Sequence, residues 1–210
     1  MVKAIIFDFQ GTLIENGVYP SPLRQVKNIL RIDAPFSDFV MRFERVMVLE
    51  QHVSLTDAFI KVCDEFHVRP RDFILEKLIG LWNKNKLLSK LYPDTAPVLA
   101  DLKQEYKLVL VANIDCFNKD LVDRFKVREY FDIIQLSCDV GMLKSDEGFY
   151  DGILKELGLD AEEVLMVGDS LESDIAASKN VGMSSVLVDR HDKREYDQKI
   201  VLLADLRKYL

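Results

Sequence analysis

The sequence predicts a doubly wound, Rossmann-like α/β fold, with a parallel-sheet core and an inserted α-helical cap domain. Three observations predict it. Short runs that are apolar on both faces recur along the chain, amphipathic helical patterns separate them, and one long interval carries helical patterns only. Strands that are apolar on both faces suit a parallel sheet covered by helices.

Five such runs are the expected strands, and most of them end in a polar or acidic residue. They occupy residues 4–9, 108–113, 133–137, 164–169 and 185–189. A helix is expected before Gly158, because Phe149, Ile153, Leu154 and Leu157 recur at helical spacing and a glycine commonly ends a helix.

The interval from Leu13 to about Tyr92 contains no convincing strand. Ser54 is placed to cap one helix there, and two further helical patterns flank it. The expected buried aromatic residues of this insert are Phe39, Phe43, Phe59, Phe66, Phe73 and Trp82. We therefore expect an α/β core of residues 1–14 and 91–210, with residues 92–106 returning to it as a helix, and a helical cap of residues 15–90.

Composition excludes several partners. The chain has 210 residues, 49% of them hydrophobic, and a net charge of −7, which disfavours binding to a nucleic-acid backbone. No run approaches the roughly 20 apolar residues of a membrane span, and the N-terminal apolar run is too short for a signal peptide. A cytoplasmic protein without nucleic-acid or membrane partners is expected, either monomer or homodimer. The charged residues 189–199 are expected to form a solvated loop.

Three expected strand ends carry polar residues: Asp8, Asn113 and Asp169. In open parallel sheets the ligand site lies beyond these ends. Carboxylates that converge there would repel each other unless a cation lay between them, and their oxygen atoms suit Mg²⁺. Other interpretations stay open. Asp8 alone could fix a turn, and Asp169 could cap a helix together with Glu172.

Four motifs, in order, resemble those of the haloacid dehalogenase superfamily. They are FDFQGTL at residues 7–13, VANID at residues 111–115, Lys144 within VGMLKSDEGFY, and VGDSLESD at residues 167–174. The helical insert resembles the cap of the subfamily that places it between the first two motifs. The resemblance covers nearly the whole chain and implies a hydrolase with this fold.

The resemblance implies a role for each matching residue. Asp8 would attack phosphorus and form an aspartyl-phosphate that water then hydrolyses. The implied catalytic residues are Asp8, Lys144 and position 10. The implied metal ligands and supports are Asp8, the backbone carbonyl of Gln10, Asp169 and Asp174. The implied phosphate-binding residues are Gly11, Thr12, Asn113 and Lys144.

Two positions depart from the family pattern. Residue 10, usually a second aspartate that acts as general acid and base, is Gln10, and residue 112, usually serine or threonine, is Ala112. Losing general acid/base help costs roughly 10²–10⁴ in rate, and losing a hydrogen bond to a charged group costs about 1.5–3 kcal/mol. Metal binding should survive, because residue 10 contributes its main chain. Turnover should be slow, and Gln10→Asp should raise it.

The leading hypothesis is a Mg²⁺-dependent phosphatase of a small phosphorylated metabolite. A 2-haloacid dehalogenase is compatible with Gln10, but Asp169 and Asp174 keep a metal signature that such an enzyme does not need. A metal- and phosphate-binding relic with a regulatory role is the non-enzymatic alternative, since two catalytic positions have changed.

Overall fold

The computed structural model describes all 210 residues. Its core is a six-stranded, entirely parallel sheet with the strand order β5-β4-β1-β6-β7-β8. The strands are β1 (Ala4–Asp8), β4 (Lys107–Ala112), β5 (Ile133–Leu136), β6 (Val164–Gly168), β7 (Ser184–Val188) and β8 (Lys199–Ile200). The predicted fold class is confirmed, and the five predicted strands are present within one residue at each end.

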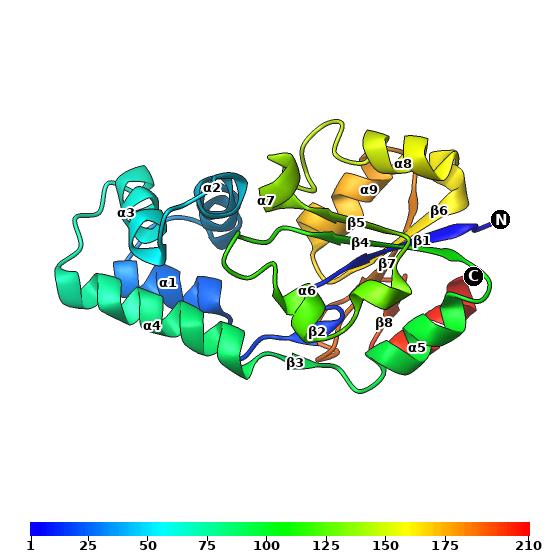
Figure 1. Ribbon diagram of the computed structural model, residues 1–210, viewed down its shortest axis with the longest axis horizontal. Helices are drawn as coiled ribbons and strands as arrows, with labels where there is room; N and C mark the ends of the chain where they lie inside the picture. Colours follow the sequence, from blue (N-terminus) through cyan, green and yellow to red (C-terminus); the bar gives the residue numbers. More distant parts are fainter.

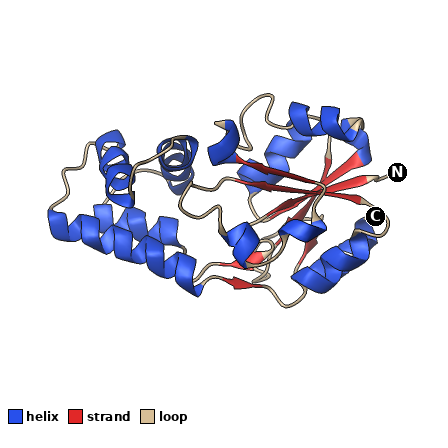
Figure 2. Cartoon of the chain, in the orientation of Figure 1, coloured by secondary structure: helices blue, strands red, loops and turns tan.

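The four central strands, β4, β1, β6 and β7, are buried on both faces, as the apolar runs predicted. Along β1, Ile5 and Phe7 belong to one hydrophobic cluster while Ala4 and Ile6 belong to another. Helices cover the two faces (Figures 1 and 2). The core helices are α5 (Thr95–Leu102), α6 (Leu121–Arg124), α7 (Ser137–Val140), α8 (Asp151–Leu157) and α9 (Ala177–Asn180). Gly158 ends α8 with φ +65°.

Between β1 and α5 the chain leaves the core and forms four helices, α1 (Pro22–Leu30), α2 (Phe36–Leu49), α3 (Leu55–Glu65) and α4 (Asp72–Leu88). Figure 1 shows them as a separate lobe, toward which β1 runs from the N-terminus. Ser54 caps α3 by accepting a hydrogen bond from the Asp57 amide. We refer to these four helices as the cap helices. The exact division at residues 15 and 90 stays a prediction.

An antiparallel pair of two-residue strands, β2 (Ile14–Glu15) and β3 (Lys90–Leu91), joins this lobe to the core. Neither strand was predicted, nor was β8, because two residues are too few to show a periodicity. The pair places the segment that enters the cap helices beside the segment that leaves them.

The cap helices have a hydrophobic core of their own. Phe43 and Phe59 both pack on Trp82, with ring centroids 5.6 and 5.7 Å away. Leu143, from the core, joins the same cluster. The expectation that Phe73 is buried is wrong: the residue is 57% exposed. It lies outside the face of α4 that carries the buried residues Leu78, Leu81, Trp82 and Asn85. No helix in the chain has the length and hydropathy that spanning a membrane requires.

Candidate active site

Three acidic residues meet at the carboxyl edge of the sheet. Asp8 ends β1, Asp169 follows β6, and Asp174 lies in the π-helical segment η3 (Leu171–Ala176) that comes next. One carboxylate oxygen from each lies within 4.8 Å of the others. The expected convergence of strand-end acids is therefore present. Asp8 is at least 161 positions away from the other two acids along the chain.

Lys144 is buried between two of these acids. Its Nζ donates to Asp8 Oδ1 at 2.6 Å and to Asp174 Oδ1 at 2.5 Å. Burial opposes the charged form of Lys144, but the charges of Asp174 and Asp8 outweigh it and hold its pKa well above the ordinary value. The ammonium group is therefore a fixed positive charge beside Asp8.

The acids outnumber this cation. Burial raises the pKa of Asp8 to about 6, although Lys144 partly offsets it, and Asp8 Oδ2 is buried without a hydrogen-bond partner. Burial, and then the charges of Asp8 and Asp174, also raise the pKa of Asp169 well above its ordinary value. Excess negative charge on oxygen donors, with an unpartnered buried oxygen among them, fits a hard divalent cation.

Two glycines allow the acids to come this close. Gly11 has φ +89°, and a Cβ built on it would lie 2.3 Å from Asp169 Oδ2. A Cβ on Gly168 would lie 2.3 Å from Asp174 Oδ2. Distances below 3 Å are not tolerated between such atoms, so a side chain at either position would displace a carboxylate.

The interpretation of Asp169 as a helix cap is wrong. Ser170 caps the segment that follows, and its Oγ accepts a hydrogen bond from the Ser173 amide at 3.1 Å. The Ser170 amide itself donates to Asp174 Oδ2 at 2.9 Å. The Asp169 carboxyl group therefore does not cap this segment. Both carboxylate oxygens of Asp174, in contrast, already accept hydrogen bonds.

The loop after β7 contributes two arginines to this edge. Arg194 donates to the backbone carbonyl of Asp169. Arg190 donates to the Thr12 carbonyl at 2.7 Å and forms an ion pair with Asp94 at 2.8 Å. The expectation of a solvated loop at residues 189–199 is wrong for these residues, because Asp189 is buried and both arginines turn inward to hold the two strand-end turns.

The other predicted site residues lie near the same edge of the sheet. Thr12 is fully buried, and its Oγ1 has no partner. Gln10 is half-buried in the turn after β1, and Ala112, at the end of β4, is buried. Asn113 joins two elements: its Oδ1 accepts from the Lys144 amide at 2.9 Å, and its Nδ2 donates to Glu44 Oε2 at 2.8 Å.

Glu44 was not among the predicted site residues. It comes from α2, a cap helix, and the charges of Lys144, Asp174 and Asp8 all act on its carboxyl group. Burial raises its pKa to about 7. No sequence signal could have found it, because a glutamate on an amphipathic helix is ordinary and only the docking of α2 over Asn113 makes it part of the site.

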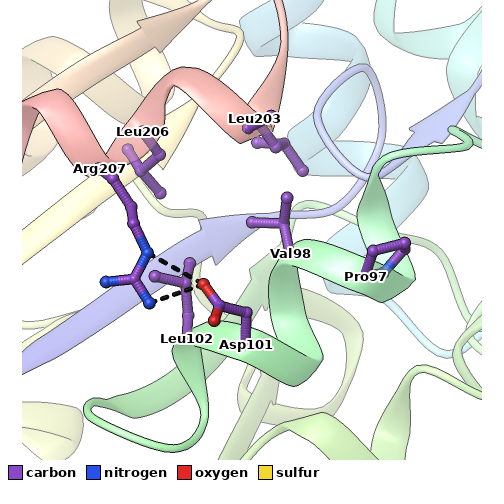
Figure 3. Close-up of a pocket in the computed structure, with 8 residues that line it drawn as sticks. Pro97, Val98, Asp101, Leu102, Leu203, Leu206 and Arg207 are labelled. Atoms are coloured by element: carbon purple, nitrogen blue, oxygen red, sulfur yellow. Dashed lines mark hydrogen bonds and ion pairs between the residues drawn. The ribbon is translucent and has the colours of Figure 1, made fainter.

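A shallow pocket elsewhere has no part in this chemistry. It lies between α5 and the C-terminal 3₁₀ segment (Leu203–Tyr209), and Figure 3 shows Arg207 bonded to Asp101 along it. None of its eight lining residues belongs to the acidic cluster.

Comparison with known families decides the family. A model described as haloacid dehalogenase-like hydrolase matches residues 2–182. The chain belongs to the haloacid dehalogenase-like hydrolases. The predicted family and the prediction that the chain is a hydrolytic enzyme are both confirmed.

Several relatives and structures resemble this haloacid dehalogenase-like hydrolase over most of its length. It is 25% identical over 194 residues to the glyceraldehyde 3-phosphate phosphatase of Methanothermobacter thermautotrophicus, covering 90% of this chain and 86% of the relative. The corresponding enzyme of Pyrococcus abyssi is 26% identical, with 89% and 81% covered. The crystal structure of a phosphatase of the family from Thermococcus onnurineus matches with a TM-score of 0.64 and 27% identity, over 99% of this chain and 97% of that one.

Proposed function

We propose that this protein is a Mg²⁺-dependent phosphatase that acts on a small phosphorylated metabolite through an aspartyl-phosphate on Asp8. One observation carries the proposal: Lys144 holds one oxygen of the buried Asp8 carboxylate, while the other oxygen has no partner. A carboxylate fixed on one side is oriented for attack with the other, or for binding a metal ion.

The acidic cluster supports the metal site. Asp8, Asp169 and the backbone carbonyl of Gln10 would hold Mg²⁺, with Asp174 close by. Because Asp174 already accepts hydrogen bonds from Lys144 and Ser170, its main contribution would be to position Lys144 and the turn that carries Asp169. The bound ion would supply positive charge for the phosphoryl oxygens.

The protein's own groups would do the remaining work. The Asp8 carboxylate attacks phosphorus, and Lys144 neutralises the charge that the nucleophile and the phosphoryl group bring together. Phosphoryl oxygens would bind the Thr12 hydroxyl, which has no protein partner, and the backbone amides of Gly11 and its neighbours. Asn113 donates one amide hydrogen to Glu44, so its second is available for phosphate.

The substrate we propose is a small sugar phosphate. Relatives that cover most of the chain are named glyceraldehyde 3-phosphate phosphatases. A ribulose-1,5-bisphosphate 5-phosphatase of Halopiger xanaduensis is 28% identical over 107 residues, half of this chain and 45% of that one. The cap helices also limit size, since Glu44 and Trp82 bond directly to the loop after β4.

The test measures phosphate release from a panel that includes glyceraldehyde 3-phosphate, with Mg²⁺ and with a chelator. Wild type should release phosphate only with the metal, and Asp8→Asn should abolish release because it removes the nucleophile. Asp139→Asn is the matched control, an exposed acid paired with Lys119 outside the cluster, and should keep wild-type activity. Wild-type release that persists in Asp8→Asn would contradict the proposal.

A further inference from the structure

Glu44 reaches the site across the boundary between the cap helices and the core. Its Oε2 accepts a hydrogen bond from the Asn113 side chain. Asn113 Oδ1 accepts in turn from the Lys144 backbone amide, and the Lys144 ammonium group donates to Asp8. A continuous chain of hydrogen bonds and covalent links therefore fixes Glu44 relative to the proposed nucleophile. Asn113 holds one oxygen of the Glu44 carboxyl group and leaves Oε1 for another partner.

Among the charged residues of the cluster, none is left to act as general acid and base. Gln10 stands where the resemblance places a general acid and base, and a carboxamide exchanges no proton near neutral pH. Asp8 is the proposed nucleophile, Lys144 is held charged between Asp8 and Asp174, and Asp174 has both oxygens bonded. Glu44 is the acid in this group that has neither a cationic partner within bonding distance nor a place in the proposed metal site.

We propose that Glu44, delivered by α2 from the cap, is the general acid and base of this enzyme in place of Gln10. The inference rests on the phosphatase function proposed above and adds the residue that moves the proton. Because Glu44 belongs to a cap helix, the acid would be in place only when the cap lies on the core, as it does in this structure.

The proton balance closes over the two half-reactions. Asp8 forms a bond to phosphorus while the bond from phosphorus to the leaving oxygen breaks, and protonated Glu44 gives its proton to that oxygen. Glu44, now a carboxylate, takes a proton from water as the water oxygen bonds to phosphorus. The bond from phosphorus to Asp8 then breaks, its electron pair returns to Asp8, and inorganic phosphate leaves with Glu44 protonated again.

The charge environment suits both directions of transfer. Burial raises the Glu44 pKa to about 7, Lys144 opposes the rise, and the charges of Asp174 and Asp8 add to it. A group with a pKa near the working pH is populated in both forms and is most effective as an acid and a base.

The alternative role for Glu44 is a simple latch that holds α2 on Asn113. The two roles differ in which kinetic constant they affect. Glu44→Gln keeps an oxygen that accepts from Asn113 but can neither give nor take a proton and carries no negative charge. A latch would then be preserved, whereas a general acid would be lost.

The experiment compares Glu44→Gln with Asp38→Asn, an exposed acid on the same helix, using an alkyl phosphate and 4-nitrophenyl phosphate. For the alkyl phosphate, Glu44→Gln should lower kcat by roughly 10²–10⁴ with little change in KM. For 4-nitrophenyl phosphate, whose leaving group needs no proton, the pre-steady-state burst of nitrophenol should persist and only the later hydrolysis should slow. Asp38→Asn should match wild type in both assays.

The pH profile is the second readout. In wild type, kcat/KM for the alkyl phosphate should fall as Glu44 loses its proton, and this limb should vanish in Glu44→Gln. The other ionisable groups that face Glu44 are Lys144, Asp174 and Asp8, and all three remain in the variant, so a limb that persists belongs to one of them and overturns the inference.

The remaining outcomes separate this inference from the proposed function. If Glu44→Gln turns over the alkyl phosphate like wild type while Asp8→Asn is inactive, the phosphatase stands and the role of Glu44 falls. If Glu44→Gln folds normally but also loses the nitrophenol burst, Glu44 serves phosphate binding or nucleophile geometry and the inference again falls. If wild type releases no phosphate from any substrate, both proposals fall.

Discussion

Trp82 Nε1 donates a hydrogen bond to Asp115 Oδ2 at 3.1 Å, and both residues are buried. The bond joins α4 to the loop after β4. Asn118 and the Phe117 amide also donate to the Asp115 carboxylate, yet burial dominates and raises its pKa. Docking of the cap helices therefore supplies a hydrogen-bond donor to the buried Asp115 carboxylate of the core.

Trp82→Phe should destabilise the protein by about 1–3 kcal/mol, because it leaves a buried carboxylate oxygen with one donor fewer and removes part of the packing against Phe43 and Phe59. Urea denaturation measures the change. Phe73→Leu, at an exposed position of the same helix, should change the free energy of unfolding by less than about 0.5 kcal/mol. Equal effects of the two substitutions would contradict a specific role for the bond.

Gly11→Ala should weaken metal binding and stability together, because the new Cβ would overlap the Asp169 carboxylate and alanine disfavours φ +89°. We expect a loss of about 1–3 kcal/mol from the backbone conformation alone. Gly152→Ala is the matched control, since nothing lies within 4 Å of its Cβ position and it lies in α8. It should raise stability by about 0.4–1 kcal/mol.

Asp169→Asn should remove the response to Mg²⁺. Wild type should melt at a higher temperature when Mg²⁺ is added, because an ion that binds only the folded state stabilises it. The variant should melt at the same temperature with and without the ion, as followed by circular dichroism. Asp192→Asn, an exposed acid in the loop after β7, should retain the wild-type response. A full Mg²⁺ shift in Asp169→Asn would exclude this residue as a ligand.

Glu44 also predicts how stability depends on pH. Its pKa is raised from 4.5 to about 7 in the folded protein. The contribution of Glu44 to the free energy of unfolding is therefore fully present below about pH 4.5 and is lost as the pH rises through 7. The full loss is of the order of 3–4 kcal/mol, because the shift spans about 2.5 pKa units and each unit corresponds to about 1.4 kcal/mol. Glu44→Gln lacks the group, so its free energy of unfolding relative to wild type should rise between pH 5 and pH 8 in guanidinium titrations. A constant difference would show that Glu44 does not change its charge in this window.

Gln10→Asp tests the same site from the core side. If Glu44 already moves the proton, Gln10→Asp should raise alkyl phosphate turnover only modestly in wild type. In the Glu44→Gln background it should raise turnover by about 10²-fold or more, within the range of general acid catalysis. Steady-state kinetics of the four proteins measures the coupling between the two positions. Equal gains in both backgrounds would mean that the two residues do not share a task.

The sequence was sufficient to predict five of the six core strands, because each of the five is an apolar run and most of these runs end in a polar or acidic residue. Val164–Gly168 is the clearest case, followed at once by Asp169. Asp8, Lys144, Asp169 and Asp174 were predicted from motifs, and the structure brings them together. The assignment of a chemical role to each remains a prediction that the experiments above test.

Residues that reach the site from outside the four motifs could not be predicted from the sequence. Arg190 and Arg194 lie in a run of alternating charges typical of solvated loops, and only the path of the chain after β7 turns them toward Thr12 and Asp169. Glu44 lies 69 residues from Asn113 along the chain. Such contacts depend on how a helix docks, and a period of 3.6 residues carries no information about docking.

The β2–β3 pair has a consequence for how the chain is assembled. Glu15 is the register partner of Lys90, so the long helical excursion starts and finishes at one point of the core. Thr95 Oγ1 and the Tyr92 amide both bond to the Leu13 carbonyl, which anchors that point from the core side. A short turn could therefore connect β2 and β3 in place of the four helices, and the strands of the core sheet would stay in the same order. The lobe that carries Glu44 could therefore be exchanged as a unit, and the exchange would replace the proposed proton donor while leaving Asp8, the proposed nucleophile, in the core.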